Sequence, residues 1–419
     1  MCKQDFGFLR GIANNPIHVT QVTSLAYVVN MLTIKRQTLE MYTDIIHRKY
    51  ETEEDLHQKH PEWFRRPQGR MTAPEILDHY NQYLRHYEDQ DEILTRRLDY
   101  DVLKEVTTKL PNLKDIVVSD ANELRVIKKS PLSDFVELHL GWFNDEKVSA
   151  RHVRAILKGA EEAGTRLQSI QAAMICSDVL DETQFGLHSM APDLLSNLTT
   201  FHMGIEAVKE GKGGLRDEDP VDIASQLSQC RALVKAGTLR SAIDKMPNLV
   251  ELDIQFHETH TITKDIFPSP ALLRDVIPLD RVWPKLKKFT ITAVETERQE
   301  LGSFLVRHKQ TLESLDLGYI RLTSTSWLKL LPYLKAQFNG TGLKHLRLLD
   351  SIIGRSEDEF EMTEAWALGH PDYDERRNRL GSAVRKYLRS RRQRRCPLRA
   401  SNMREELVSG QMPGSDEEW

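Results

Sequence analysis

The chain has 419 residues, of which 40% are hydrophobic and 29% are charged, and its formal net charge is −4. This composition argues against a wholly disordered chain, and the balance of 58 basic and 62 acidic residues carries no signature of polyanion binding. The four cysteines form no CxxC pair, which argues against a secreted disulfide scaffold and against a structural zinc site.

The N-terminal segment has neither the basic start nor the apolar stretch of a signal peptide. The most apolar window, residues 24–34, is far shorter than the ~20 residues that span a bilayer. We therefore expect an intracellular protein, cytoplasmic or nuclear or both, with no membrane partner.

One pattern recurs along the chain: an apolar residue, a proline or small residue, a polar residue, and then Leu-x-x-apolar-x-apolar. Four strong copies span 110–118, 195–203, 246–254 and 283–291, and looser copies span 22–27, 135–140, 166–172, 311–317 and 342–348. In each strong copy an apolar residue that can end a helix precedes a position that stops it, and an alternating strand follows. The pattern predicts a series of short strands with one face toward a core.

Helix-like segments lie between these strands. Thr72-Ala-Pro-Glu75 is a capping box that opens a helical stretch, and Asp219-Pro-Val-Asp222 opens a second one. Residues 296–309 and 324–335 carry apolar stripes at helical spacing. Because strands and helices alternate, the strands are predicted to be parallel.

The predicted fold class is α/β: a degenerate leucine-rich-repeat-like solenoid over residues 1–355, with a curved parallel sheet and helices on its outer face. A long helical insertion is expected at about 72–110, and residues 356–419 are expected to form a charged helical or disordered tail. The spacing of the copies is irregular, and Ile320 and Ser351 stand where a strict repeat has asparagine. The alternative is an ordinary α/β domain with a flat parallel sheet.

The copies, taken together with residues 303–331, resemble the leucine-rich-repeat half of fungal F-box proteins. Residues 15–27 resemble the first strand region after the F-box, and the helix near 80–90 and the arginine-rich 391–398 also resemble parts of that family. The resemblance covers most of residues 8–355. It implies that the repeat half recognises a target, while the F-box docks that target to the adaptor of a ubiquitin ligase.

The F-box itself, a helical module that normally precedes the repeats and carries an early Leu-Pro, is not evident before Phe6. We expect a truncated gene model, a fragment, or a paralogue that lost ligase docking. The predicted function is a non-enzymatic interaction module that binds a protein target, with the ligase adaptor as a partner only if an F-box lies upstream. The alternative is a scaffolding solenoid unrelated to ubiquitination.

No catalytic, cofactor-binding or metal site is predicted. His257-Glu-Thr-His260 has its histidines three residues apart rather than the four of the zinc-protease motif HExxH. Gly211-Lys-Gly-Gly214 lacks the spacing of a phosphate-binding loop, so a polar linker is predicted. Cys176 lies among apolar residues, which favours a buried thiol over a catalytic one.

The segment 385–399 carries eight basic residues and no acidic ones. It has two interpretations that stay open: a nuclear-import or nucleic-acid patch, or a helix end that pairs with the acidic run 357–364. Because Tyr387 is its only aromatic residue, we expect no nucleic-acid partner.

Solenoids present one long strand-bearing face to their partners. Polar residues that alternate with the predicted core positions of the strands are therefore the candidates for partner binding, with solvated strand residues as the alternative reading. These candidates are His202, Asp253, Gln255, His257, Thr290, Asp316 and Arg347.

Overall fold

The computed structural model describes residues 3–28, 37–59, 70–119, 146–181, 190–207, 220–257, 269–355, 363–369, 378–390, 395–399 and 403. The chain divides into two compact units. The first comprises residues 1–22, 26–111 and 118–163, and the second comprises residues 23–25, 112–117 and 164–419.

The first unit is mainly helical. Its helices are α1 (Lys3–Asn14), α2 (Pro16–Val19), α3 (Leu39–Lys59), α4 (Ala73–Thr95), α5 (Leu98–Thr108) and α7 (Glu146–Glu162). Helices α3 and α4 enclose a small core of Tyr42, Ile46, Ile76 and Tyr83. The predicted capping box opens α4, where the backbone N–H of Thr72 donates to Glu75 Oε2 at 2.7 Å. The predicted helical segment 72–110 thus contains α4 and α5.

Helices α5 and α7 approach closely at Gly159. A Cβ atom at this position would lie 2.6 Å from the carbonyl oxygen of Lys104 and 2.8 Å from Cβ of Thr107. We expect Gly159→Ala to lower the free energy of unfolding by about 1–3 kcal/mol through overpacking, although alanine is the better helix former. Urea unfolding followed by circular dichroism measures this change.

Gly11 in α1 provides the matched control, because a Cβ there meets no atom within 4 Å. Gly11→Ala is expected to raise the free energy of unfolding by about 0.5–1 kcal/mol through helix propensity alone. A similar gain in both variants would contradict the close contact between α5 and α7.

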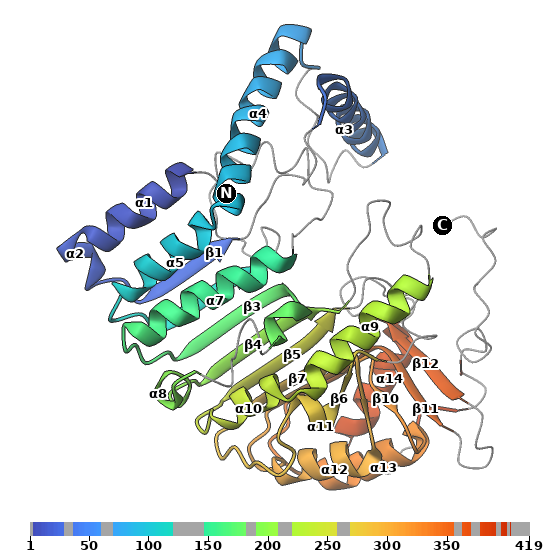
Figure 1. Cartoon of the computed structure of the whole chain (residues 1–419). Helices are drawn as coiled ribbons and strands as arrows, with labels where there is room; N and C mark the ends of the chain where they lie inside the picture. Colours follow the sequence, from blue (N-terminus) through green and yellow to red (C-terminus); the bar gives the residue numbers. More distant parts are fainter. Residues whose placement is uncertain are drawn as a thin grey trace. The chain divides into compact units, whose positions relative to one another are not determined.

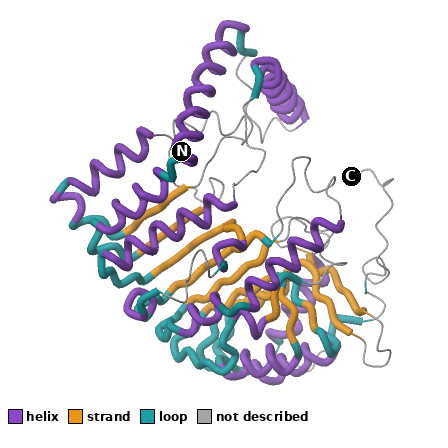
Figure 2. Tube along the Cα trace, in the orientation of Figure 1, coloured by secondary structure: helices purple, strands orange, loops and turns teal. Residues whose placement is uncertain are grey.

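The principal strands of the sheet follow the order β1-β2-β3-β4-β5-β7-β9-β11, and those from β3 to β11 lie wholly in the second unit. The strands are β1 (Ser24–Val28), β2 (Asp115–Ser119), β3 (Ser169–Cys176), β4 (Thr200–Glu206), β5 (Glu251–His257), β7 (Lys288–Thr292), β9 (Ser314–Gly318) and β11 (His345–Arg355). From β3 to β11, each strand pairs in parallel with the next, and Figure 2 shows β3, β4, β5 and β7 side by side. The predicted α/β class with a mostly parallel sheet is confirmed.

The predicted copies of the repeating pattern coincide with these strands. The four strong copies end in β2, β4, β5 and β7, and the looser ones include β1, β3, β9 and β11. The apolar positions of the pattern are buried: Phe201, Met203, Leu252, Ile254, Phe289, Ile291, Leu315 and Leu317 are each at most 1% exposed. The copy at 135–140 lies outside the described residues.

A second set of short strands runs beside the first. Strands β6 (Ala271–Leu272), β8 (Val294–Thr296) and β10 (Arg321–Leu322) pair in parallel, and β10 pairs with the later part of β11. The chain turns into this set at Ala293 and Tyr319, which have φ values of 55° and 50°. These residues follow Thr292 and Gly318, which are register partners, so the two turns occupy equivalent positions. The backbone N–H of Ala293 donates to the carbonyl of Gly318 at 2.9 Å and fastens one turn to the next strand.

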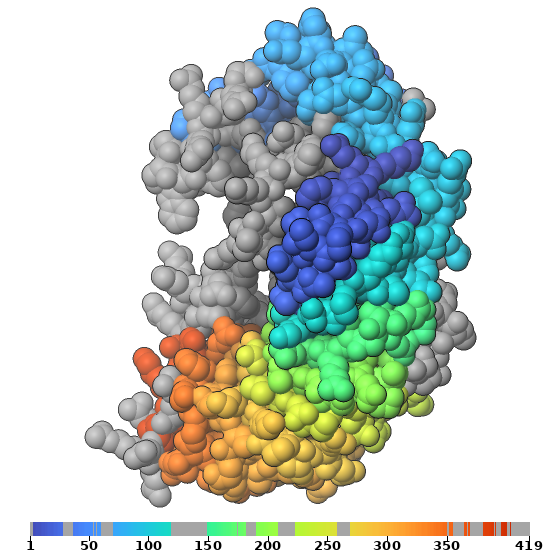
Figure 3. Space-filling view, turned by 90° about the vertical axis from the view of Figure 1, so that its left-hand side faces the viewer, coloured from blue at the N-terminus to red at the C-terminus, as the bar shows by residue number. Residues whose placement is uncertain are grey.

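The helices of this unit follow one another along the sheet. They are α8 (Pro192–Leu195), α9 (Pro220–Lys235), α10 (Thr238–Asp244), α11 (Leu273–Val276), α12 (Arg298–Arg307), α13 (Trp327–Phe338) and α14 (Asn378–Arg389), with a 3₁₀ turn η1 (Ser177–Leu180). Helices α10, α11, α12 and α13 contact each other in succession (Figure 1). Green, yellow and orange segments of this unit accordingly succeed one another in Figure 3. The rings of Phe289 and Phe304 lie 4.8 Å apart and join the apolar face of β7 to α12.

The described part of the C-terminal segment contains an element that the sequence did not indicate. Besides helix α14, strand β12 (Thr363–Gly369) pairs antiparallel with β11. Its side chains Ala365, Trp366 and Leu368 are buried, and Trp366 Nε1 donates to the carbonyl of Arg399 at 3.2 Å. The prediction of only helix or disorder after residue 355 missed this strand, because a single short strand lacks the recurring context of the copies. No helix in the described part of the chain has the length and apolarity needed to cross a membrane.

Candidate functional site

One face of the parallel sheet is mostly polar from β4 to β11. Side chains alternate across a strand, so residues two apart lie on the same face. On the face opposite the buried apolar side chains, neighbouring strands present Thr200, His202, Gly204 and Glu206 of β4, Glu251, Asp253, Gln255 and His257 of β5, Lys288, Thr290 and Thr292 of β7, Ser314, Asp316 and Gly318 of β9, and His345, Arg347 and Leu349 of β11. We call this set the polar face.

Five of the seven predicted partner-binding residues form a single row on this face. His202 is the register partner of Asp253, Asp253 of Thr290, Thr290 of Asp316, and Asp316 of Arg347. We call these five residues the central row. Sequence spacing did not predict this row, because it depends on the relative register of five strands.

The other two predicted residues lie farther along β5. Gln255 is the register partner of Thr292, and His257 is the register partner of Glu206. The second histidine of the HExxH-like motif, His260, lies outside the described residues. Gln255 contributes to the central row directly, since its Nε2 donates to Asp253 Oδ1 at 2.9 Å.

The best-defined contact of the row joins β9 to β11. Arg347 Nε donates to Asp316 Oδ1 at 2.8 Å, and Arg347 Nη2 donates to Asp316 Oδ2 at 2.6 Å. The Asp316 side chain is 3% exposed, while that of Arg347 is 43% exposed. Such a two-pronged pair fixes both side chains in orientation.

The carboxyl group of Asp253 is in a different environment. Burial raises the pKa of Asp253 above its ordinary value, while the Gln255 hydrogen bond and the positive charges of His202 and Lys288 oppose the shift. Burial also lowers the pKa of His202, whose Nε2 lies 3.4 Å from Glu251 Oε2. Both groups are therefore biased toward their neutral forms.

Thr290 lies in the row between the two aspartates. It is 5% exposed, and its Oγ1 is buried without a hydrogen-bond partner among the described residues. Asp253, Thr290 and Asp316 are thus buried, and the alternative reading of plain solvated strand residues does not hold for these three.

Within the described part of the chain, the other predicted chemical motifs bring no second site together. Cys176 is 1% exposed, as its apolar neighbours indicated. The glycine-rich residues 211–214 and the basic residues 391–394 lie outside the described part of the chain. Among the described residues, no group of three His, Cys, Asp or Glu side chains is placed to hold a metal ion.

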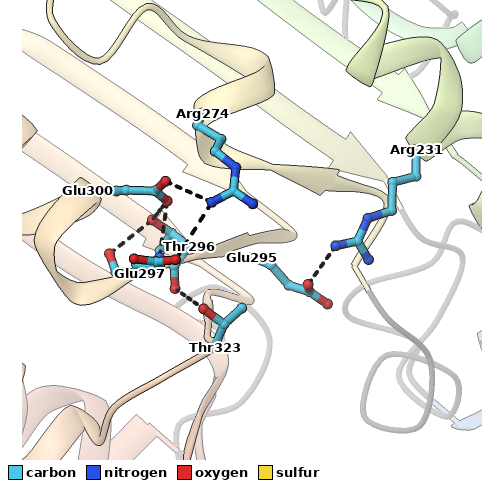
Figure 4. Close-up of polar contacts among 7 residues, drawn as sticks. All are labelled: Arg231, Arg274, Glu295, Thr296, Glu297, Glu300 and Thr323. Carbon is cyan, nitrogen blue, oxygen red and sulfur yellow. Dashed lines mark hydrogen bonds and ion pairs between the residues drawn. The ribbon is translucent and has the colours of Figure 1, made fainter.

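A charged network lies at the second set of strands (Figure 4). Arg231 of α9 reaches Glu295 of β8 with an Nη2–Oε2 distance of 2.9 Å, and the backbone N–H of Ser269 donates to Glu295 Oε1 at 3.1 Å. Arg274 of α11 reaches Glu300 with an Nη1–Oε1 distance of 3.2 Å.

Glu300 also closes a capping box at the start of α12, since its Oε2 accepts from the backbone N–H of Glu297 at 3.2 Å. The Arg231–Glu295 and Arg274–Glu300 contacts each fasten one element to another, so we assign the network to stability. The Glu297-x-x-Glu300 spacing was the sequence signal for its capping part.

A buried charge cluster in the first unit has no sequence signal. Asp99 of α5 is fully buried, and its Oδ2 accepts from Arg151 Nε at 2.9 Å and from His152 Nε2 at 2.7 Å, both on α7. Burial alone would raise the pKa of Asp99, but the His152 hydrogen bond and the Arg151 charge outweigh it and lower the pKa. The cluster joins α5 to α7.

The chain was compared with known proteins. No protein-family model matches it, and no curated protein matches it either.

Proposed function

We propose that the chain is a non-enzymatic protein-interaction module whose polar face binds a protein partner. One observation carries this proposal: a parallel sheet with one apolar face and one face that is polar across five strands. Parallel sheets ordinarily bury both faces under helices and read as continuous apolar runs. A strand face that departs from this rule, and fixes Asp316 and Arg347 in a two-pronged pair, is suited to a macromolecular ligand.

The same observation favours a leucine-rich-repeat-like solenoid over an ordinary flat α/β sheet. Strands β5, β7, β9 and β11 neighbour each other in chain order, and helices α10 to α13 succeed one another in the same order. In a solenoid each unit contacts only its neighbours, and the strand face is the binding face. The equivalent turns at Ala293 and Tyr319 support a repeated unit.

The direct test exchanges the charges of the Asp316–Arg347 pair. The double variant Asp316→Arg/Arg347→Asp retains an ion pair but reverses the charge pattern of the central row. To identify the partner, a photoreactive amino acid replaces Gln255 in a chain that is otherwise unmodified. It cross-links the partner in cells, and the captured protein is then purified. We expect the double variant to bind that protein at least tenfold more weakly, because like charges now face each other.

Gln299 is the control position for capture, since it is exposed and lies on helix α12 and not on a strand of the polar face. The partner should be captured from position 255 and not from position 299. Unchanged binding by the double variant, together with unchanged stability, would contradict a role for the polar face.

The ubiquitin-ligase part of the proposal is supported by the resemblance alone. If the chain serves as the substrate-recognition part of an F-box protein, the ligase adaptor co-purifies with the product of the whole gene. Absence of the adaptor, with the partner still bound, would favour a scaffolding solenoid.

A further inference from the structure

The carboxyl groups of the polar face differ in how their charge is balanced. Asp316 is paired with Arg347, and Glu251 lies 3.9 Å from Lys288 Nζ and 3.4 Å from His202 Nε2. Among the described residues, no cation forms an ion pair with Asp253. Its one hydrogen bond within that part of the chain comes from the neutral amide of Gln255.

A second polar group beside Asp253 also has unused capacity. Thr290 is the register partner of Asp253 on one side and of Asp316 on the other, so its side chain shares their face. Its Oγ1 is buried and accepts no hydrogen bond from the described residues. A buried polar atom without a partner costs free energy, which a ligand that supplies a donor recovers.

We propose that a cationic side chain of the protein partner, arginine or lysine, binds at the centre of the polar face and donates N–H groups to the Asp253 carboxylate and the Thr290 hydroxyl. This inference rests on the proposed function and specifies the chemistry of the partner. A cation supplies the positive counter-charge for the Asp253 carboxylate and a hydrogen-bond donor for the Thr290 hydroxyl.

The surrounding charges favour a cation over an anion. Glu251 and Asp253 lie on β5 and Asp316 lies on β9, and the Arg347 guanidinium is already paired with Asp316. The side chains of Glu251 and Lys288, in the adjacent row, are 39% and 35% exposed. An anionic partner group would meet two or three carboxylates at this point and would be repelled.

The test uses the full chain and a fluorescently labelled hexa-arginine peptide, with labelled hexaglutamate as the opposite charge. Fluorescence anisotropy at low ionic strength measures the dissociation constants, because exposed charges are screened at high salt. We expect Asp253→Asn to weaken hexa-arginine binding about tenfold, since it removes a charged hydrogen-bond acceptor. Thr290→Val, which keeps the shape and removes the hydroxyl, is expected to weaken binding about threefold.

Asp280→Asn is the matched control, because Asp280 is exposed in the loop before β7 and carries the same charge. It is expected to leave binding unchanged. An equal effect of Asp253→Asn and Asp280→Asn, or hexaglutamate binding as tight as hexa-arginine binding, would overturn the inference.

The pH dependence provides a second readout. A cation binds the ionised carboxylate, and burial raises the pKa of Asp253, so the affinity of the unmodified chain should rise with pH through that raised pKa. Asp253→Asn should lose this part of the dependence. The groups that face Asp253 and also titrate or carry charge are His202, Glu251, Lys288, Asp316 and Arg347, and all of them remain in the variant.

Loss of binding through misfolding is separable from loss of the site. A folded-state pKa above the unfolded value means that Asp253 favours folding at low pH, and this contribution is lost as pH rises through the folded pKa. At pH 7 the Asn variant should therefore unfold at a temperature no lower than the unmodified chain.

The two proposals fail in different ways. If Asp253→Asn binds hexa-arginine normally while the exchanged Asp316/Arg347 pair still loses the captured protein, this inference is wrong and the proposed function stands. If the exchanged pair binds the captured protein normally while Asp253→Asn loses hexa-arginine, the cation site is real and the proposed function is wrong.

Discussion

Asp99→Ala is expected to lower the free energy of unfolding by about 3–5 kcal/mol. The alanine would leave the fully buried imidazole of His152 and the guanidinium of Arg151 without their shared acceptor. The effect should fall near the lower end of this range, because the Arg151 side chain remains 21% exposed and can reach water. Urea unfolding followed by circular dichroism measures the loss, and hydrogen exchange should show it first in α5 and α7.

The matched control is Asp101→Ala on the same helix, because Asp101 is exposed. Asp101→Ala should lower the free energy of unfolding by less than about 1 kcal/mol, which is the contribution of one acidic residue to the start of a helix. The pKa of Asp99 is lowered in the folded state, so its stabilisation is present above the unfolded pKa and disappears as pH falls through the folded one. The difference between the unmodified chain and the Asp99 variant should therefore narrow in strong acid. Equal losses at positions 99 and 101 would contradict the buried cluster.

Trp283→Ala is expected to lower the free energy of unfolding by about 3–5 kcal/mol through the cavity that it leaves. Trp283 precedes β7 in the chain and is fully buried. Its ring packs against Phe304 and His308 at centroid distances of 6.2 and 5.7 Å. Its Nε1 donates to the carbonyl of Met246 at 2.8 Å, which ties one strong copy of the pattern to the preceding one. Urea unfolding measures the change.

Two further variants separate packing from hydrogen bonding at this position. Trp283→Phe keeps most of the ring but leaves the Met246 carbonyl without its donor, and about 1–3 kcal/mol should be lost. Val282→Ala is the neighbouring control, since Val282 is 53% exposed and should change stability by less than about 0.5 kcal/mol. A phenylalanine variant as unstable as the alanine variant would show that the indole N–H dominates.

The positions of the strands could be predicted from the sequence because local signals coincide there. In Trp283-Pro-Lys-Leu286, the proline stops a helix and the alternation that follows separates a core side chain from a polar one. That alternation also placed His202, Asp253, Thr290, Asp316 and Arg347 on one face. Local patterns therefore predicted which face each residue occupies.

The arrangement within the face could not be predicted, because it depends on register between strands that are far apart in sequence. The Asp316–Arg347 pair joins residues 31 positions apart, and a shift of one residue would move either side chain to the other face. The sequence did not indicate the turns at Ala293 and Tyr319 either, because a residue with positive φ is usually glycine or asparagine. The burial of Asp253 and Thr290 likewise had no signal in their own segments.

The chain-order arrangement of the second unit has a consequence for synthesis on the ribosome. Within the principal set, strands β3, β4, β5, β7, β9 and β11 each pair with the member of that set made before them. A newly made strand therefore finds its template already present, and the sheet can grow as the chain emerges. Sheets whose central strand comes last must hold unpaired edges until synthesis ends, and such edges promote aggregation. In this unit the growing edge of the principal set is always the member added last, until β12 pairs with β11.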